Sequence, residues 1–242
     1  MTVLDEVVAA HGGIERFEAI DELRVGLRCG GVALPSRGRP RALRGLDAEV
    51  RLHEPHVRFV DWPRRGETGV FEGWQARIEA GGQVLRQREG RRSRLLWDHL
   101  DVLHFAGYAL WNYLAAPFLL TRPGFRVREL DGRRLEVDFP SELPTHSARQ
   151  VFHLDERGRI ARLDYTAEVF GRWARAAHLC LEYRRIAGLV VPVRRRVVPR
   201  GPADVVLPGP TLVSIAIDDV RASPPSADRA ALGSASADGL RG

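Results

Sequence analysis

The sequence predicts a mainly β, α+β fold. We expect a curled antiparallel sheet or half-open barrel, with an N-terminal helix and an apolar helical insert covering the concave face. About a dozen segments alternate apolar and polar residues, the pattern of half-buried strands. Most are joined by short turns such as Asp131-Gly132 and Ala187-Gly188, which favours an antiparallel meander. A flat open sheet rarely exceeds about ten strands, so this sheet should curl.

The first twenty residues have helical periodicity. Apolar residues and His11 recur at helical spacing over 3–11, and acidic residues occupy the first turn, where the helix dipole favours them. The glycine pair at 12–13 ends this helix. Ile14, Phe17 and Ile20 then have the spacing of a further short helical turn.

From residue 21 the apolar period changes to two. Leu23, Val25, Leu27 and Cys29 alternate with charged residues or glycine, so this segment is predicted to be a half-buried strand. Glycine-rich or proline-containing breaks separate the strands that follow. Further strands are predicted at 46–53, 56–62, 67–71, 74–79, 83–88, 125–130, 133–139, 148–154, 159–169, 176–186, 189–198 and 211–220.

The insert at 91–122 interrupts the strands with helical patterns. One helix is predicted over 94–105 and a second over 108–116, with Gly107 between them and Pro117 as the stop. No residue from 102 to 120 is charged, which approaches the length of a transmembrane helix. Gly107, Asn112 and Pro117 count against that alternative, so we expect a helical hairpin that plugs the concave face of the sheet.

Length and composition predict one domain. The 242 residues are 44% apolar, enough for a core without disulfide staples. We assign the domain to 1–221 and a disordered tail to 222–242, because that tail has almost no large apolar residue to bury. The net charge is +6, but every one of the 37 basic residues is Arg and they are spread along the chain. No nucleic-acid module accompanies them, so no nucleic-acid partner is predicted.

The sequence lacks the motifs of several common enzyme classes. There is no Walker loop, no Rossmann glycine pattern after a strand, no His-Glu-x-x-His and no Gly-x-Ser-x-Gly, so no cofactor is predicted. Asp98, Asp101 and His104 are three residues apart, but acids in a first helical turn explain them better than a metal, and no metal site is predicted. The start of the chain is neither basic nor followed by an apolar run, so we expect a cytoplasmic protein.

The order of elements resembles a known family. An N-terminal helix, strands, central apolar helices and further strands, over roughly 3–221, resemble the LolA/LolB lipoprotein carriers. The resemblance implies a half-open antiparallel barrel, closed by helices, that holds lipid chains. Without a signal sequence or lipid anchor, we expect an apolar ligand cavity and not lipoprotein trafficking. Three stretches are also similar to bacterial proteins with no assigned reaction: 107–118, Pro144-Thr-His-Ser147, and Asp164-Tyr165 followed by Ala176-Ala-His178.

The hairpin formed by 146–154 and 159–169 supplies the first candidate site. With a turn at 155–158, residue 154 pairs with 159 and 150 with 163. His146, Gln150 and Tyr165 then share an apolar face that should line the cavity, where they would orient a ligand or exchange protons. The alternative is a hydrogen-bonded core network. A register shift of one residue would place Asp164 inside instead.

Further candidates lie in the next strand and in the insert. His178 is more often structural than catalytic at such a position, and Cys180 lies two residues on, on the same strand face. Cys29 is a second free cysteine of the predicted core. The aromatic residues of the insert are predicted to form a wall of the cavity. The ligand-binding candidates are Trp97, His104, Tyr108, Trp111 and Gln150.

The leading prediction is a soluble protein that binds a hydrophobic small molecule or acyl chain between the curled sheet and the helices. Transient contact with a membrane is a variant of this prediction, and the oligomeric state is left open. The alternative is a cofactor-independent isomerase, cyclase or hydrolase acting on an apolar metabolite in the same cavity. Its catalytic residues would be His146 or His178 as base and Tyr165 as hydrogen-bond donor. A purely structural or partner-binding domain is a third possibility.

Overall fold

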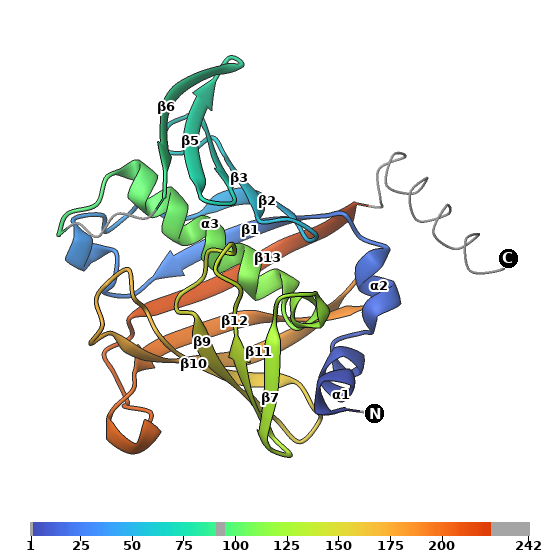
Figure 1. The fold of residues 1–242 in the computed structure, drawn as a ribbon. Coiled ribbons are helices and arrows are strands. Elements are labelled where there is room, and N and C mark those ends of the chain that lie inside the picture. Colours follow the sequence, from blue (N-terminus) through green and yellow to red (C-terminus); the bar gives the residue numbers. More distant parts are fainter. Residues whose placement is uncertain (1, 91–94, 224–242) are drawn as a thin grey trace, which may run out of the picture.

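The computed structural model describes residues 2–90 and 95–223, and Figure 1 shows its fold. The helices are α1 (Val3–Ala10), α2 (Ile14–Glu18) and α3 (His99–Ala115), with short 3-10 turns η1 (Pro35–Arg37), η2 (Phe118–Thr121) and η3 (Pro202–Asp204). The strands are β1 (Glu22–Gly30), β2 (Leu46–Arg51), β3 (His56–Val60), β4 (Thr68–Glu72), β5 (Gln75–Ala80), β6 (Gln83–Glu89), β7 (Arg126–Asp131), β8 (Arg134–Asp138), β9 (Arg149–Leu154), β10 (Ile160–Thr166), β11 (Arg175–Ile186), β12 (Leu189–Pro199) and β13 (Val213–Ser223).

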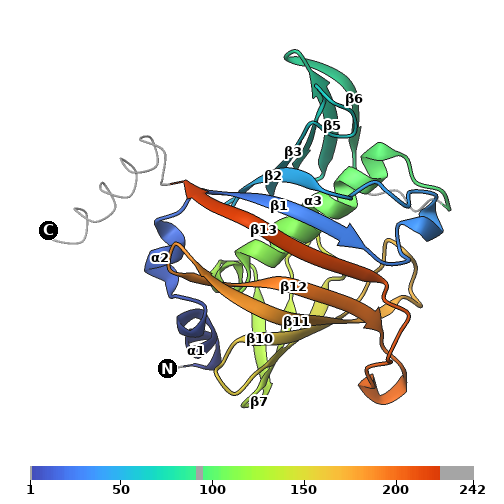
Figure 2. The same ribbon diagram turned by 180° about the vertical axis from the view of Figure 1, so that it is seen from behind.

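These strands form one curled, unclosed antiparallel sheet, which confirms the predicted fold class. Their order is β6-β5-β4-β3-β2-β1-β13-β12-β11-β10-β9-β8-β7 among the described residues. Two meanders therefore meet where the first strand pairs with the last, with Leu23 opposite Ala222 and Leu27 opposite Ile217. The edges are β6 and β7, and α3 is the connection between them. A connection between opposite edges must cross a face of the sheet, and Figures 1 and 2 show α3 lying across the concave face.

The central helix is continuous, which corrects the predicted helical hairpin. The helix was predicted to begin at residue 94, which lies outside the described residues, but 95–98 are not helical and the helix begins at His99. Asp98 caps it: the Asp98 carboxylate accepts from the Asp101 backbone N–H. Gly107 does not break the helix. A Cβ there would lie 2.4 Å from the Cβ of Phe71, so glycine permits close contact between α3 and β4. The helix ends where Ala116 becomes extended before Pro117.

The two N-terminal helices cover one end of the sheet. Thr2 and Asp5 form a reciprocal capping box at the start of α1. Gly13 has a positive φ of 86°, which glycine adopts readily, and the chain turns there into α2. The His11 carbonyl accepts from the Val190 N–H, which ties α1 to β12. Figure 1 shows both helices at the end of the molecule opposite η1. Among the described residues, no helix combines the length and apolar character needed to cross a membrane.

Two local predictions need correction. In the β9–β10 hairpin, Leu163 lies opposite Phe152 and not opposite Gln150. Leu154 already pairs with Ile160, one residue later than predicted, and a bulge between Ile160 and Arg162 shifts the register by one residue more. The shift is even, so the same side chains still share one face. The tail was predicted to begin at 222, but pairing with β1 extends β13 to Ser223. The rest of the predicted tail, 224–242, lies outside the described residues.

Candidate functional site

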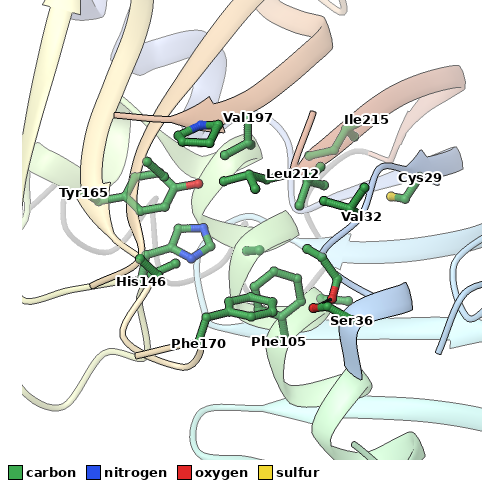
Figure 3. Close-up of a pocket in the computed structure, with 18 of the residues that line it drawn as sticks. Cys29, Val32, Ser36, Phe105, His146, Tyr165, Phe170, Val197, Leu212 and Ile215 are labelled. Carbon is green, nitrogen blue, oxygen red and sulfur yellow. Dashed lines mark hydrogen bonds between the residues drawn. The ribbon is translucent and has the colours of Figure 1, made fainter. Parts of the chain in front are cut away.

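A cavity of about 340 Å³ lies between α3 and the concave face of the sheet. Its walls come from α3, from β1 and β10–β13, and from two loops: 31–45 between β1 and β2, and 167–174 between β10 and β11. Most lining side chains are aliphatic or aromatic, and Figure 3 shows Phe105 and Phe170 facing Val197, Leu212 and Ile215 across it. Such a lining favours apolar ligands, because burial of their surface is the main source of affinity.

His146 and Tyr165 form the polar side of this cavity. Their rings stack with centroids 4.2 Å apart and planes 5° apart. The Tyr113 hydroxyl lies 2.6 Å from His146 Nε2, and the Tyr108 hydroxyl lies 3.3 Å from Nδ1. Burial lowers the pKa of His146 to about 3, so the ring is neutral and donates from one nitrogen while accepting at the other. Both nitrogens of His146 therefore already have tyrosine partners.

The Tyr165 hydroxyl has looser contacts. It lies 3.5 Å from His178 Nδ1, at the limit of a hydrogen bond, and it also faces the Tyr113 hydroxyl. Burial raises the pKa of Tyr165 well above its usual value, so the phenol stays protonated. Figure 3 shows this hydroxyl pointing into the cavity. Tyr165 is thus the polar side chain best placed to hydrogen-bond a ligand.

A buried arginine that the sequence analysis did not select lies behind this cluster. Arg195 of β12 donates to the Tyr113 carbonyl (2.7 Å) and the Pro192 carbonyl (3.3 Å), and its guanidinium lies 4.8 Å from the Tyr113 ring centroid. Among the described residues, no carboxylate is paired with it. One signal was present in the sequence: Arg195 interrupts the apolar alternation of Val191, Val193 and Val197.

The three stretches singled out in the sequence meet at this cluster. Tyr108 and Tyr113 come from the first stretch, His146 from the second, and Tyr165 and His178 from the third. Asn112 of α3 fixes the loop that carries His146, because its side-chain amide donates to the carbonyls of Tyr108 (2.7 Å) and Pro144 (3.0 Å).

His178 and Gln150 lie beside the cavity without lining it. His178 is fully buried on the concave side of β11, with its ring edge-on to Tyr113 at 4.6 Å. Burial first, and then the Arg195 charge, hold its pKa well below the usual range. Gln150 is turned to its own loop, where its amide donates to Thr145 Oγ1 (2.6 Å) and the Ser147 carbonyl (3.3 Å).

The aromatic candidates of the insert occupy different places. Tyr108 supports His146, whereas Trp97 packs behind the cavity wall, 5.3 Å from Phe105 and 5.0 Å from Phe170 between ring centroids. His104 lies on the other side of α3, 5.7 Å from Phe71 and 5.8 Å from Trp74. Trp111 is fully buried and lies outside the lining.

Asp98 and Asp101 cap the N-terminus of α3. Both carboxylates bind Arg88 of β6, with Asp101 Oδ1 2.6 Å from Arg88 Nη1, and both close the capping box of α3. Within the described ranges, no group of three or more His, Cys, Asp or Glu side chains is arranged to hold a metal ion.

The two cysteines lie in apolar surroundings. Cys29 lines the cavity, and burial raises the pKa of its thiol to about 12, so it is no thiolate nucleophile at neutral pH. Cys180 is buried with its Sγ 3.6 Å from Arg195 Nη1. Asp164, the alternative under a register shift, is buried on the opposite face against Arg162 (2.6 Å), His153 (2.9 Å) and Arg200 (3.5 Å).

Known proteins resemble this chain in structure. No protein-family model matches the sequence, and no curated protein matches it. A LolA-superfamily protein of Nitrosomonas europaea superposes with a TM-score of 0.52 at 12% identity, covering 93% of this chain and 94% of that one. A DUF1329-family protein of Desulfovibrio piger gives a TM-score of 0.52 at 13% identity, with the same coverages. The predicted resemblance is therefore confirmed at the level of architecture: the chain has a LolA-like fold.

Proposed function

We propose that this protein binds one hydrophobic small molecule or one acyl chain in the cavity beneath α3. The observation that carries the proposal is the lining: apolar on nearly all sides, with His146 and Tyr165 on one side. Ligand pockets in proteins span roughly 300–1,000 Å³. A cavity of about 340 Å³ is at the small end of that range, which favours a single chain or a compact molecule.

The polar end of the ligand is a neutral oxygen, such as a hydroxyl or carbonyl. Tyr165 supplies the hydrogen bond, and His146 holds the Tyr165 ring in place by stacking. A buried ligand carboxylate would need a cation beside it, because an unpaired buried charge is costly. The two arginines of the lining, Arg175 and Arg200, are already paired with Asp204 at 2.8 and 2.9 Å.

The same geometry supports binding over catalysis. His146 was the candidate base, but its nitrogens are both used and its pKa of about 3 makes it a weak proton acceptor. His178 contributes no atom to the cavity lining. The LolA-like fold adds support, because carriers of that kind are expected to hold lipid chains.

The first experiment is native mass spectrometry of the protein purified from its own host, followed by denaturation to identify any released molecule. A fluorescent acyl probe with a neutral ester end is then titrated into the wild type, Tyr165→Phe and Tyr183→Phe. We expect Tyr165→Phe to weaken binding about fivefold, the effect of one neutral hydrogen bond.

Tyr183→Phe is the matched control. The Tyr183 hydroxyl donates to the Ile160 carbonyl (2.5 Å) and lies outside the cavity lining, so this variant should bind within about twofold of the wild type. A wild type that carries no ligand and takes up no probe would overturn the proposal. Equal losses in the two variants would overturn the role of Tyr165.

A further inference from the structure

Large apolar side chains are exposed around the mouth of the cavity. Trp173 is 79% exposed, Leu95 80% and Leu96 68%, and Val32 is also exposed. Val32 and Trp173 belong to the two loops that line the cavity, and Leu95 and Leu96 lie just before α3. We name these four residues the apolar rim. Exposed apolar residues that cluster mark an interaction surface more often than scattered ones do.

Arg37 ties the three segments of the apolar rim together. Its guanidinium donates to the Leu95 carbonyl (3.4 Å) and the Phe170 carbonyl (3.1 Å), and lies 4.9 Å from the Phe170 ring centroid. The backbone N–H of Trp97 donates in turn to the backbone carbonyl of Arg37 (3.1 Å). Figures 1 and 2 show the 31–45 loop and the approach to α3 at the same end of the molecule, away from α1 and α2. The apolar rim therefore presents its side chains as one ordered surface.

Positive charge accompanies the apolar rim. The loop 31–45 carries Arg37, Arg39, Arg41 and Arg44 and no acidic residue. Arg172 adds a further positive charge beside Trp173. In the described part of the chain, no carboxylate forms an ion pair with Arg39, Arg41 or Arg44, although Asp47 and Asp61 share a surface hollow with them. Three arginines against two carboxylates leave this surface with a net positive charge.

We propose that the apolar rim docks on an anionic phospholipid bilayer, with the mouth of the cavity against the headgroups. Tryptophan and leucine side chains partition into the interfacial layer, and arginines beside them are attracted to anionic lipid. The combination fits a lipid surface better than an apolar protein groove, because the loop 31–45 carries four arginines and no acidic residue, and no carboxylate among the described residues forms an ion pair with Arg39, Arg41 or Arg44. A ligand could then pass between bilayer and cavity without crossing water. Docking needs no occupied cavity, so it and the proposed function fail independently.

The test is co-sedimentation of the full chain with vesicles of phosphatidylcholine, with and without phosphatidylglycerol. We expect binding to vesicles that contain phosphatidylglycerol, weakened by salt, and little binding to phosphatidylcholine alone. Trp173 serves as a reporter, because lipids brominated near the headgroup should quench this exposed indole on docking.

Two variants, one of the apolar rim and one of the arginines beside it, are each matched by a control. Leu95→Ser with Leu96→Ser should lower partitioning at least tenfold, whereas Leu181→Ser, 59% exposed on β11 and outside the rim, should change it less than twofold. Arg39→Gln with Arg41→Gln should cost roughly fivefold per arginine, and Arg184→Gln on β11 should cost little. Uptake of the acyl probe from solution should survive in all four.

Three results would overturn the docking proposal. The first is a wild type that does not sediment with anionic vesicles, and the second is equal loss in Leu181→Ser and the rim variant. The third is rim-dependent binding to a protein partner while vesicles are ignored, which would assign the surface to that partner. Loss of probe uptake with vesicle binding intact would instead count against the proposed function alone.

Discussion

The two sides of α3 face the same sheet, but one side is closely packed against it and the other borders a cavity. On one side Gly107 lies against Phe71 of β4, so closely that a Cβ would clash, and the His104 ring lies 5.7 Å from that of Phe71. On the other side Ala106, Ala109 and Leu110 line about 340 Å³ of unfilled space. The helix is almost uniformly apolar and buried, so composition does not distinguish the sides. What differs is how closely the sheet approaches.

The comparison separates stability from binding. A close-packed side should respond strongly to any change of volume, because protein interiors pack like crystals. Side chains that face a cavity lack contact atoms on that side, so larger side chains should be tolerated there. The added atoms would occupy space that the ligand needs. Three predictions test this contrast and one tests the buried histidines, in order from the largest expected effect on stability to the smallest.

Phe71→Ala should cost about 3–5 kcal/mol of unfolding free energy, because it removes a fully buried ring from the packed side. Leu110→Ala, on the cavity side, should cost at most about 2 kcal/mol, the low end for a deletion of this kind. Urea unfolding followed by circular dichroism measures both. Equal costs would show that the two sides are packed alike.

Acid should lower the unfolding free energy of the protein, because its buried histidines are held neutral in the folded state. The folded-state pKa values of His146 and His11 are about 3 and about 4, against 6.5 for an accessible histidine, so the unfolded chain binds protons first as the pH falls. Stability should be full above pH 6.5 and fall by ~1.4 kcal/mol per pH unit for each group below it. The fall should end near the folded pKa values.

Urea unfolding between pH 7.5 and 5 measures this loss, in a range where carboxylates titrate little. His146→Gln should remove ~1.4 kcal/mol per pH unit from the slope. An unchanged slope in that variant would show that His146 is not held neutral in the folded protein.

Gly107→Ala should cost about 1–3 kcal/mol, the usual penalty of overpacking. Alanine is intrinsically about 1 kcal/mol better than glycine within a helix, so the sign of the change is decisive. The clash with Phe71 predicts a loss, and propensity alone predicts a gain. In a Phe71→Ala background the clash is absent, so Gly107→Ala should cost little of the about 1–3 kcal/mol that it costs in the wild type. A double-mutant cycle measures this difference.

Ala109→Leu should have the smallest effect on stability, within about 1 kcal/mol, because the added carbons enter the cavity. Binding of the acyl probe should weaken at least tenfold. Ala115→Leu is the control on the same helix, at a fully buried position outside the lining, and should cost about 1–3 kcal/mol. A destabilised Ala109→Leu that still binds the probe would contradict the assignment of this side to the cavity.

The sequence by itself determined the strands, their antiparallel order and the faces of the β9–β10 hairpin, because period-two alternation and turn residues are local properties. It also pointed to His146, Tyr165 and the central insert. The even register shift left the predicted faces intact, since only an odd shift exchanges them.

Only the tertiary structure decided that the central helix is continuous, where the cavity lies and which polar groups reach it. The helix contains a glycine at 107 because Phe71, distant in sequence, lies where a Cβ would be. Gln150 shares a strand face with Tyr165 but bonds its own loop instead of reaching the cavity. Arg195 is buried because Tyr113 of α3 covers it. Each outcome depends on distances between segments far apart in the chain, and local periodicity carries no information about those distances.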